Sequence, residues 1–204
     1  MYNKPLIVFE GIEGSGKTLH SKLLASYLKK KKIKFINLRE PGGNINSERI
    51  RKLILSNKSK FNKITDLFLY LAARNENLEN LIKKNYKKKI IIIDRFIDST
   101  LAYQHYGMGI DYKLINNLNY YLTKEIKIDL TFLNLVNFKN LKKRLSKRKN
   151  LNRYDKFNIK FYKKVQNGYM KISKSKKKKY KIIDTNKTIL ENRQIIIKNV
   201  MSLL

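Results

Sequence analysis

Residues 11 to 18 read GIEGSGKT and have the types and spacing of a phosphate-binding loop. Gly11, Gly16, Lys17 and Thr18 satisfy the pattern G-x-x-x-x-G-K-[ST], between an apolar run and a helical pattern. Glycines let backbone N–H groups curl around an anion, and the N-terminus of the next helix adds partial positive charge. The sequence therefore predicts a nucleoside triphosphate site, with Lys17 on the β- and γ-phosphates and Thr18 on Mg²⁺.

A second group of polar residues follows the apolar run IIII. Asp94 stands where a buried strand would meet its loop, and we expect it to bind the same metal ion through water. Arg95 could clamp the phosphate of an acceptor and stabilise charge on the transferring group, although a buried Asp–Arg ion pair would explain the same dipeptide. One helical turn later, Ser99, Thr100 and Tyr103 offer hydroxyl groups to a nucleoside.

Two further segments could form the pocket for that acceptor. REPGG at 39–43 ends an expected strand, where Pro41 stiffens the chain and the glycines allow close approach of a ligand, although it could be only a turn. In the helical segment 64–82, Tyr70 could stack on a base while Arg74 bonds its edge, although two surface side chains would show the same spacing. The apolar positions expected to face the core in this helix are Ile64, Leu67, Phe68, Leu71, Ala72, Leu78 and Leu81.

The elements that must position these residues are those of an α/β protein. Apolar runs alternate with helix-length segments, which predicts a parallel sheet covered by helices on both faces. No linker or repeat divides the chain, so we expect one domain, 1–204. The basic segment 143–156 lies between two helical patterns and is typical of a mobile lid that closes over phosphates. The expected strands are 6–10, 34–38, 90–94, 130–135 and 180–184.

Composition narrows the class of protein further. The 204 residues include no Cys, which excludes disulfides and thiolate metal sites, and no apolar run has the length of a signal peptide or a membrane span. A soluble cytoplasmic protein is therefore expected. The 47 Lys and Arg against 15 Asp and Glu give a net charge of +32. Because the lysines are scattered through every segment, we interpret them as solvated side chains, with a nucleic-acid surface as the alternative.

Taken in order along the chain, these segments resemble the thymidylate kinase family. The resemblance is carried by FEGIEGSGKT, REPGG, LYLAAR, DRFIDSTLAYQ, YGMGID, DLTFLNL and IIDTN. It implies a P-loop kinase fold, with a five-stranded parallel sheet and a mobile lid, and transfer of the γ-phosphate of ATP to dTMP with Mg²⁺. Gly14 after Glu13 is similar to the group whose lid supplies the catalytic arginines, here Arg148 and Arg153.

The resemblance also implies roles for individual residues. Those implied in catalysis are Glu13, Lys17, Arg95, Arg148 and Arg153. Those implied in ATP binding are Gly11, Ile12, Glu13, Gly14, Ser15, Gly16, Lys17 and Thr18. Those implied in dTMP binding are Glu13, Arg39, Pro41, Tyr70, Arg74, Arg95, Ser99, Thr100, Tyr103 and Gln104. Thr18 and Asp94 would hold the metal, the latter through water.

The expected partners are ATP, dTMP and, by the same resemblance, a second copy of the chain in a homodimer. No membrane and no specific nucleic acid is expected. Two alternatives stay open on the sequence. A kinase with another monophosphate or a nucleoside as acceptor would carry the same loop and lid, and a nucleic-acid-binding P-loop protein would exploit the positive charge.

Overall fold

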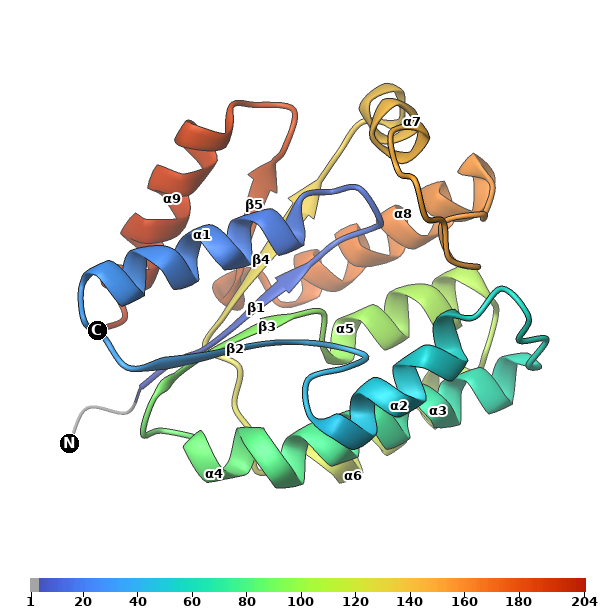
Figure 1. The fold of residues 1–204 in the computed structure, drawn as a ribbon, viewed down its shortest axis with the longest axis horizontal. Helices are drawn as coiled ribbons and strands as arrows, with labels where there is room; N and C mark the ends of the chain where they lie inside the picture. The colour runs from blue at the N-terminus through green and yellow to red at the C-terminus, as the bar shows by residue number, and fades with distance from the viewer. Residues whose placement is uncertain (1–3) are drawn as a thin grey trace.

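The computed structural model describes residues 4–204, and five parallel strands form one sheet in the order β2-β3-β1-β4-β5 (Figure 1). The strands are β1 (Leu6–Glu10), β2 (Phe35–Arg39), β3 (Ile90–Asp94), β4 (Leu130–Leu135) and β5 (Tyr180–Asp184). The predicted fold class is confirmed, and only β2 is displaced, by one residue, from its predicted bounds.

Helices connect the strands and cover both faces of the sheet. The α-helices are α1 (Lys17–Lys30), α2 (Ile45–Leu55), α3 (Lys63–Asn77), α4 (Lys83–Asn85), α5 (Ile97–Thr100), α6 (Tyr112–Thr123), α7 (Phe138–Ser146), α8 (Ile159–Ser175) and α9 (Ile189–Met201). Two π-helical segments, η1 (Leu78–Ile82) and η2 (Leu101–Gly107), extend α3 and α5, and a short 3₁₀ turn, η3 (Lys177–Lys179), precedes β5. None of the helices described between residues 4 and 204 has both the length and the apolar character to cross a membrane.

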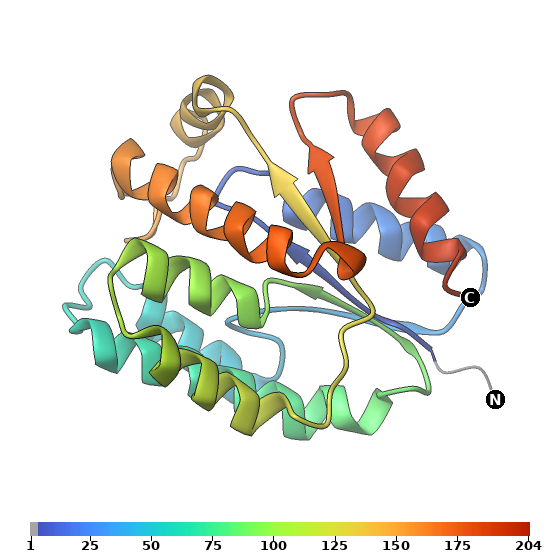
Figure 2. The same ribbon diagram turned by 180° about the vertical axis from the view of Figure 1, so that it is seen from behind.

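Alternate residues of each central strand enter two different cores. Ile7 and Phe9 of β1 pack with the helices α1 and α9, which lie in front of the sheet in Figure 1. Leu6 and Val8 point to the opposite face, where η1 covers them. Figure 2 shows this second face, over which α8, α5 with η2, and α6 lie. Because both faces are covered, β1 and β3 are buried at every position and are apolar except for the carboxylates at their ends, Glu10 and Asp94.

The register of the strands brings the predicted site residues to one edge. Phe9 of β1 and Arg39 of β2 both pair with Asp94 of β3, so the three strands end side by side. The phosphate loop, the REPGG turn and the turn after Asp94 therefore all leave the sheet at its carboxyl edge. Ligands of open α/β sheets bind at this edge.

The apolar stripe predicted for the segment 64–82 is wrong in part. Leu67, Leu71 and Leu78 are buried, as expected, but Ile64, Phe68 and Ala72 are exposed. The helix instead turns the face that carries Asp66, Tyr70, Arg74 and Asn77 inward. Polar partners on neighbouring segments make this burial possible, because they satisfy the hydrogen-bonding groups of that face.

Candidate active site

The phosphate-binding loop turns sharply between β1 and α1. Gly11 and Gly16 have φ values of 141° and 84°, which other residues rarely adopt. A Cβ at Gly11 would also stand 2.4 Å from the carbonyl oxygen of Asn134. Because α1 begins at Lys17, directly after Gly16, its first free N–H groups lie at the loop.

The side chain of Lys17 is folded back over the same loop. Its Nζ donates to the carbonyl oxygen of Ile12 at 2.7 Å and lies 3.4 Å from Oγ of Ser15. Burial lowers the pKa of Lys17 to about 7. A phosphate beside the amine would favour its charged form, since an anion raises the pKa of a nearby ammonium.

Thr18 and Asp94 form a small cluster of oxygen atoms beside the loop. Thr18 Oγ1 donates to Asp94 Oδ2, while Asp94 Oδ1 is buried without a partner among the described residues. A hydroxyl and a carboxylate suit Mg²⁺, which prefers oxygen ligands and keeps several waters. The unpartnered oxygen is available to a metal-bound water, so the residues present fit this ion.

Arg95 links the phosphate loop to the other side of the cavity. Its Nη1 donates to the carbonyl oxygen of Gly11 at 2.8 Å, and its Nη2 to Glu13 Oε1 at 2.7 Å. The hydroxyl of Tyr103 donates to the other oxygen of Glu13. Burial, the largest single influence, lowers the pKa of Arg95, but Glu13 together with Tyr103, Tyr169 and Asp94 outweighs it and holds that pKa well above its ordinary value. Asp94 and Arg95 therefore bind different groups and do not form the buried ion pair with each other that was the alternative: Asp94 accepts from Thr18, whereas Arg95 donates to Gly11 and Glu13.

Arg74 and Tyr70 lie at the opposite end from the loop. The guanidinium of Arg74 forms a buried ion pair with Glu40, with 2.8 Å between Nε and Oε2, and also donates to Oγ1 of Thr100 at 2.9 Å. Nε2 of Gln104 and Oε1 of Glu40 are buried without protein partners in the described chain. Such atoms need a ligand or water, because an unpaired buried polar group is costly.

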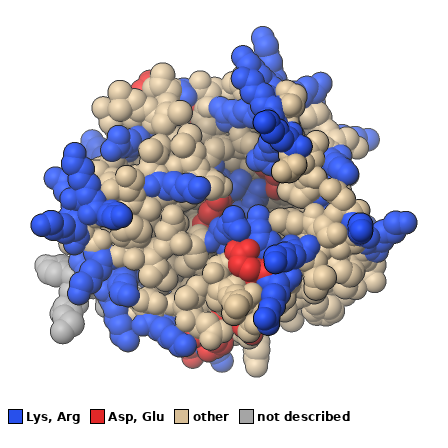
Figure 3. Space-filling view, in the orientation of Figure 1, with Lys and Arg blue, Asp and Glu red and all other residues tan. Residues whose placement is uncertain are grey.

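One cavity of about 340 Å³ brings these residues together. Figure 3 shows the face of the molecule hollowed near its centre, with acidic and basic side chains around the hollow. The predicted residues that line the cavity are Glu13, Gly14, Gly16, Lys17, Thr18, Arg39, Pro41, Tyr70, Arg74, Asp94, Arg95, Ser99, Thr100, Tyr103, Gln104 and Arg148. The predicted residues outside its lining are Gly11, Ile12, Ser15 and Arg153.

The two predicted lid arginines have different surroundings. Arg148 lines the cavity and pairs with Asp155. Arg153 pairs with Asp66 of α3, and its Nε donates to the carbonyl oxygen of Ile54. Contact between Arg153 and a phosphate in the cavity therefore requires the guanidinium to leave α3.

Known proteins are similar to this chain over most of its length. The family model described as thymidylate kinase matches residues 9–196. The chain belongs to the thymidylate kinase family. It is 40% identical over 193 residues to a thymidylate kinase of Sulfurihydrogenibium, covering 94% of both chains, and 40% identical to one of Thermosipho africanus, covering 96% of this chain and 99% of the relative. The crystal structure of thymidylate kinase from Ehrlichia chaffeensis has a TM-score of 0.80 at 33% identity, covering 98% and 99% of the two chains.

Some cavity residues of this thymidylate kinase family member were not predicted from the sequence. They are Leu19, Glu40, Arg51, Leu55, Arg144, Asn152 and Tyr154. Arg144 donates to the carbonyl oxygens of Gly14, at 2.9 Å, and Thr185, at 2.6 Å. Nothing in its local sequence separates it from the many neighbouring cations. Glu40 stands inside the REPGG segment, where an acidic residue between two predicted site residues could have been noticed.

Proposed function

We propose that this chain transfers the γ-phosphate of ATP to dTMP, giving ADP and dTDP, in the synthesis of dTTP. Membership of the thymidylate kinase family supports the reaction. The observation that supports it most directly is that one cavity connects Lys17 and Thr18 with Tyr70 and Arg74, and that Arg95 lies between them. A triphosphate on the loop and a nucleotide in the pocket would meet at this arginine.

The donor nucleotide is assigned to the loop of residues 11–18. Backbone N–H groups and Lys17 would bind the phosphates of ATP. Thr18 would hold Mg²⁺ directly, and Asp94 would hold it through water. When bound, Mg²⁺ neutralises charge on the β- and γ-phosphates.

The acceptor is assigned to the opposite end of the cavity. Tyr70 would stack on thymine, while Arg74, Thr100 and Gln104 would bond the edge of the base. The ring of Tyr103 would crowd the 2′ position of the sugar and disfavour ribonucleotides. The remaining residues assigned to dTMP are Glu13 near the 3′-hydroxyl, Arg95 on the phosphate, and Arg39, Pro41 and Ser99 around them.

The chemistry needs no nucleophile from the protein. An oxygen of the dTMP phosphate forms a bond to the γ-phosphorus as the bond from that phosphorus to the β–γ bridging oxygen breaks, and ADP leaves with the electron pair. The protein holds the two phosphates in line and supplies positive charge through Lys17, Arg95 and Arg148. Arg153 joins them once the lid, residues 143–156, releases it from Asp66.

The acceptor profile tests this proposal. Purified protein is incubated with ATP, Mg²⁺ and each monophosphate in turn, and ADP release is followed. We expect dTMP to give the highest kcat/KM, and Lys17→Ala to abolish the signal as the control. Equal or faster turnover of CMP or GMP would assign the chain to another acceptor. DNA binding that persists at physiological salt, without ADP release from dTMP, would favour the nucleic-acid alternative.

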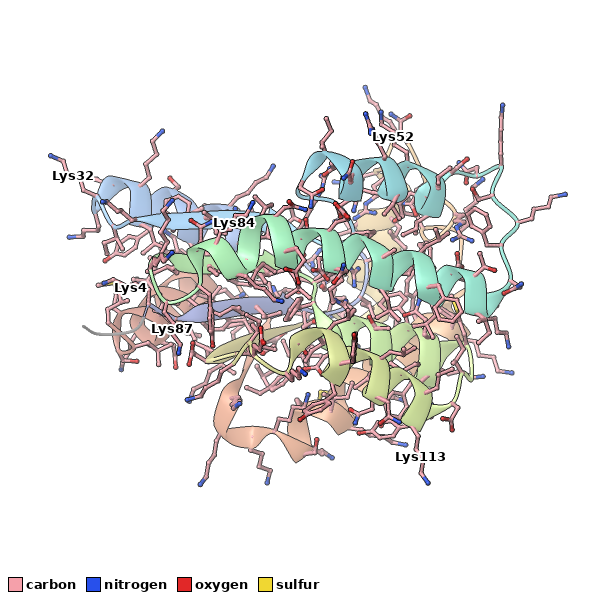
Figure 4. All side chains as sticks on the ribbon, turned by 90° about the horizontal axis from the view of Figure 1, so that it is seen from below. Lys4, Lys32, Lys52, Lys84, Lys87 and Lys113 are labelled. Carbon is pink, nitrogen blue, oxygen red and sulfur yellow. The ribbon has the colours of Figure 1, made fainter. Side chains whose placement is uncertain are left out.

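We also propose that the chain forms a homodimer. Phe68 of α3 is 52% exposed, and Tyr120 and Tyr121 of α6 are 68% and 74% exposed. Both helices lie on the face seen in Figure 4, where Lys52 and Lys113 extend from opposite edges. Exposed aromatic side chains bordered by polar residues are typical of protein interfaces.

A further inference from the structure

The guanidinium of Arg74 is bound by four residues from three segments of the chain. Only 2% of this residue is exposed. Beyond the pairing of Nε with Glu40, Nη1 donates to Thr100 and to Oδ1 of Asn119, at 2.9 and 2.7 Å, and Nη2 donates to the carbonyl oxygen of Phe96 at 3.0 Å. The plane of the guanidinium is therefore fixed from several directions.

Asn119 is the one of these partners that comes from α6. It is 4% exposed and is not among the residues that line the cavity. Its Nδ2 lies 3.4 Å from the carbonyl oxygen of Ile97, to which it donates. Because Arg74 is a donor and the carbonyl of Ile97 is an acceptor, the amide oxygen of Asn119 faces Arg74 and its NH₂ group faces Ile97. Asn119 can therefore act on a ligand only through that arginine.

A count of donors shows what this arrangement leaves free. A guanidinium has five N–H groups, and the four bonds given above use four of them. The remaining N–H is on Nη2, and Arg74 is one of the residues that line the cavity. One N–H held in a fixed direction needs an acceptor on the ligand, such as a ring carbonyl. An amino group in the same place would set a donor against a donor.

We propose that Asn119 is a positioning residue that fixes Arg74 with a single free N–H, and so makes the pocket select a base with a carbonyl over one with an amino group at the facing position. The inference rests on the proposed function, because it assumes that a pyrimidine nucleotide enters this pocket. Without Asn119, an Nη1 hydrogen becomes free in addition to the one on Nη2, and the guanidinium loses its contact to α6. The guanidinium of Arg74 could then turn away from an amino group on the base, and the pocket would discriminate less between a base with a carbonyl and one with an amino group.

The test compares Asn119→Leu and Asn119→Asp with the wild-type protein. The leucine removes the acceptor at similar size, whereas the aspartate keeps an oxygen acceptor for Nη1. For Asn119→Leu we expect the Kd of dTMP, measured by calorimetry, to rise about tenfold and the dTMP over dCMP ratio of kcat/KM to fall about tenfold. The Kd of ATP should stay within about twofold. Asn119→Asp should recover most of the dTMP affinity. Asn117→Leu, at an exposed position of the same helix, is the matched control.

Two results would overturn the inference. One is an unchanged dTMP over dCMP ratio in a folded Asn119→Leu protein. The other is an equal loss of affinity for ATP and dTMP, which indicates a general structural role. Should the leucine variant fail to fold, Asn119→Ser, whose side chain is one atom shorter, is judged by the same ratio. Absence of dTMP turnover in the wild-type protein would instead contradict the proposed function, so the two failures are distinguishable.

Discussion

Glu10 is a buried carboxylate that joins the end of β1 to the turn carrying Arg95. It accepts hydrogen bonds from the backbone N–H groups of Phe96, at 2.9 Å, and Ser99, at 3.2 Å. The hydroxyls of Ser99 and Tyr169 donate to it as well, at 2.5 and 3.1 Å. The backbone of Arg95 has a φ of 71°, which is unusual for a residue with a side chain. Glu10 therefore stabilises the turn that aims Arg95 into the cavity.

The pH dependence of stability should report on this carboxylate. Burial, followed by repulsion from Asp98, raises the pKa of Glu10 from 4.5 to about 7. The folded protein thus holds this proton more tightly than the unfolded chain, so the stabilisation is fully present below about pH 4.5 and is lost as pH rises through about 7. Because Glu10→Gln resembles the protonated side chain, we expect the variant to gain stability relative to wild type from about pH 5 to about pH 8, by up to about 3 kcal/mol.

Urea unfolding of both proteins at each pH measures this difference. Taking the difference between the two proteins cancels the titration of other groups that both share. Glu125→Gln, at an exposed position, is the control and should show a constant difference. A constant difference for Glu10→Gln as well would mean that Glu10 is ionised over the whole range.

At the scale of elements, α3 contributes side chains to the proposed nucleotide pocket and also contacts the predicted lid segment, residues 143–156. Its inward face carries Arg74 and Tyr70, and one turn earlier Asp66 binds Arg153 and the hydroxyl of Tyr154. The ring of Tyr154 also stands edge-on to Tyr70, with centroids 5.9 Å apart. The predicted lid segment, residues 143–156, therefore contacts the same helix that is proposed to bind the base.

Removal of this docking contact should loosen the lid. In Asp66→Asn the carboxylate that holds Arg153 becomes neutral, so the charge-assisted bond is lost. We expect trypsin to cleave the basic segment 143–156 several-fold faster than in wild type, because proteolysis follows local opening. Mass spectrometry of early fragments locates the cuts. Glu79→Gln, exposed on η1, is the control, and equal cleavage of Asp66→Asn and wild type would show that this ion pair does not hold the lid.

At the scale of the whole molecule, the exposed apolar side chains of α3 offer a test of the proposed homodimer. Phe68 belongs to the apolar positions that were predicted to enter the core and are instead exposed. If they are covered by a second chain, Phe68→Glu should convert the dimer to a monomer by placing a charge in an apolar interface. Sedimentation equilibrium measures the mass. Ile189→Glu, exposed at the start of α9, should leave it unchanged. A wild-type protein that sediments as a monomer would exclude the homodimer.

The sequence by itself determined the features that are local in the chain. The phosphate loop needs glycines, a lysine and a threonine at fixed spacing, and the buried strands need continuous apolar runs, so both could be predicted with their bounds. The parallel arrangement of the strands follows from the alternation of strand and helix segments along the sequence. Once the strands are parallel, their carboxyl ends meet, and Thr18 and Asp94 come together as expected.

Only the tertiary structure decided which side of α3 is buried and what holds Arg74. Helical spacing defines an apolar stripe and a polar stripe, but partners elsewhere in the chain decide which of them points inward. Glu40, Phe96, Thr100 and Asn119 reach Arg74 from 22 to 45 residues away. Hydrogen bonds over such separations have no period in the sequence, because they depend on how whole elements pack and not on spacing within one of them.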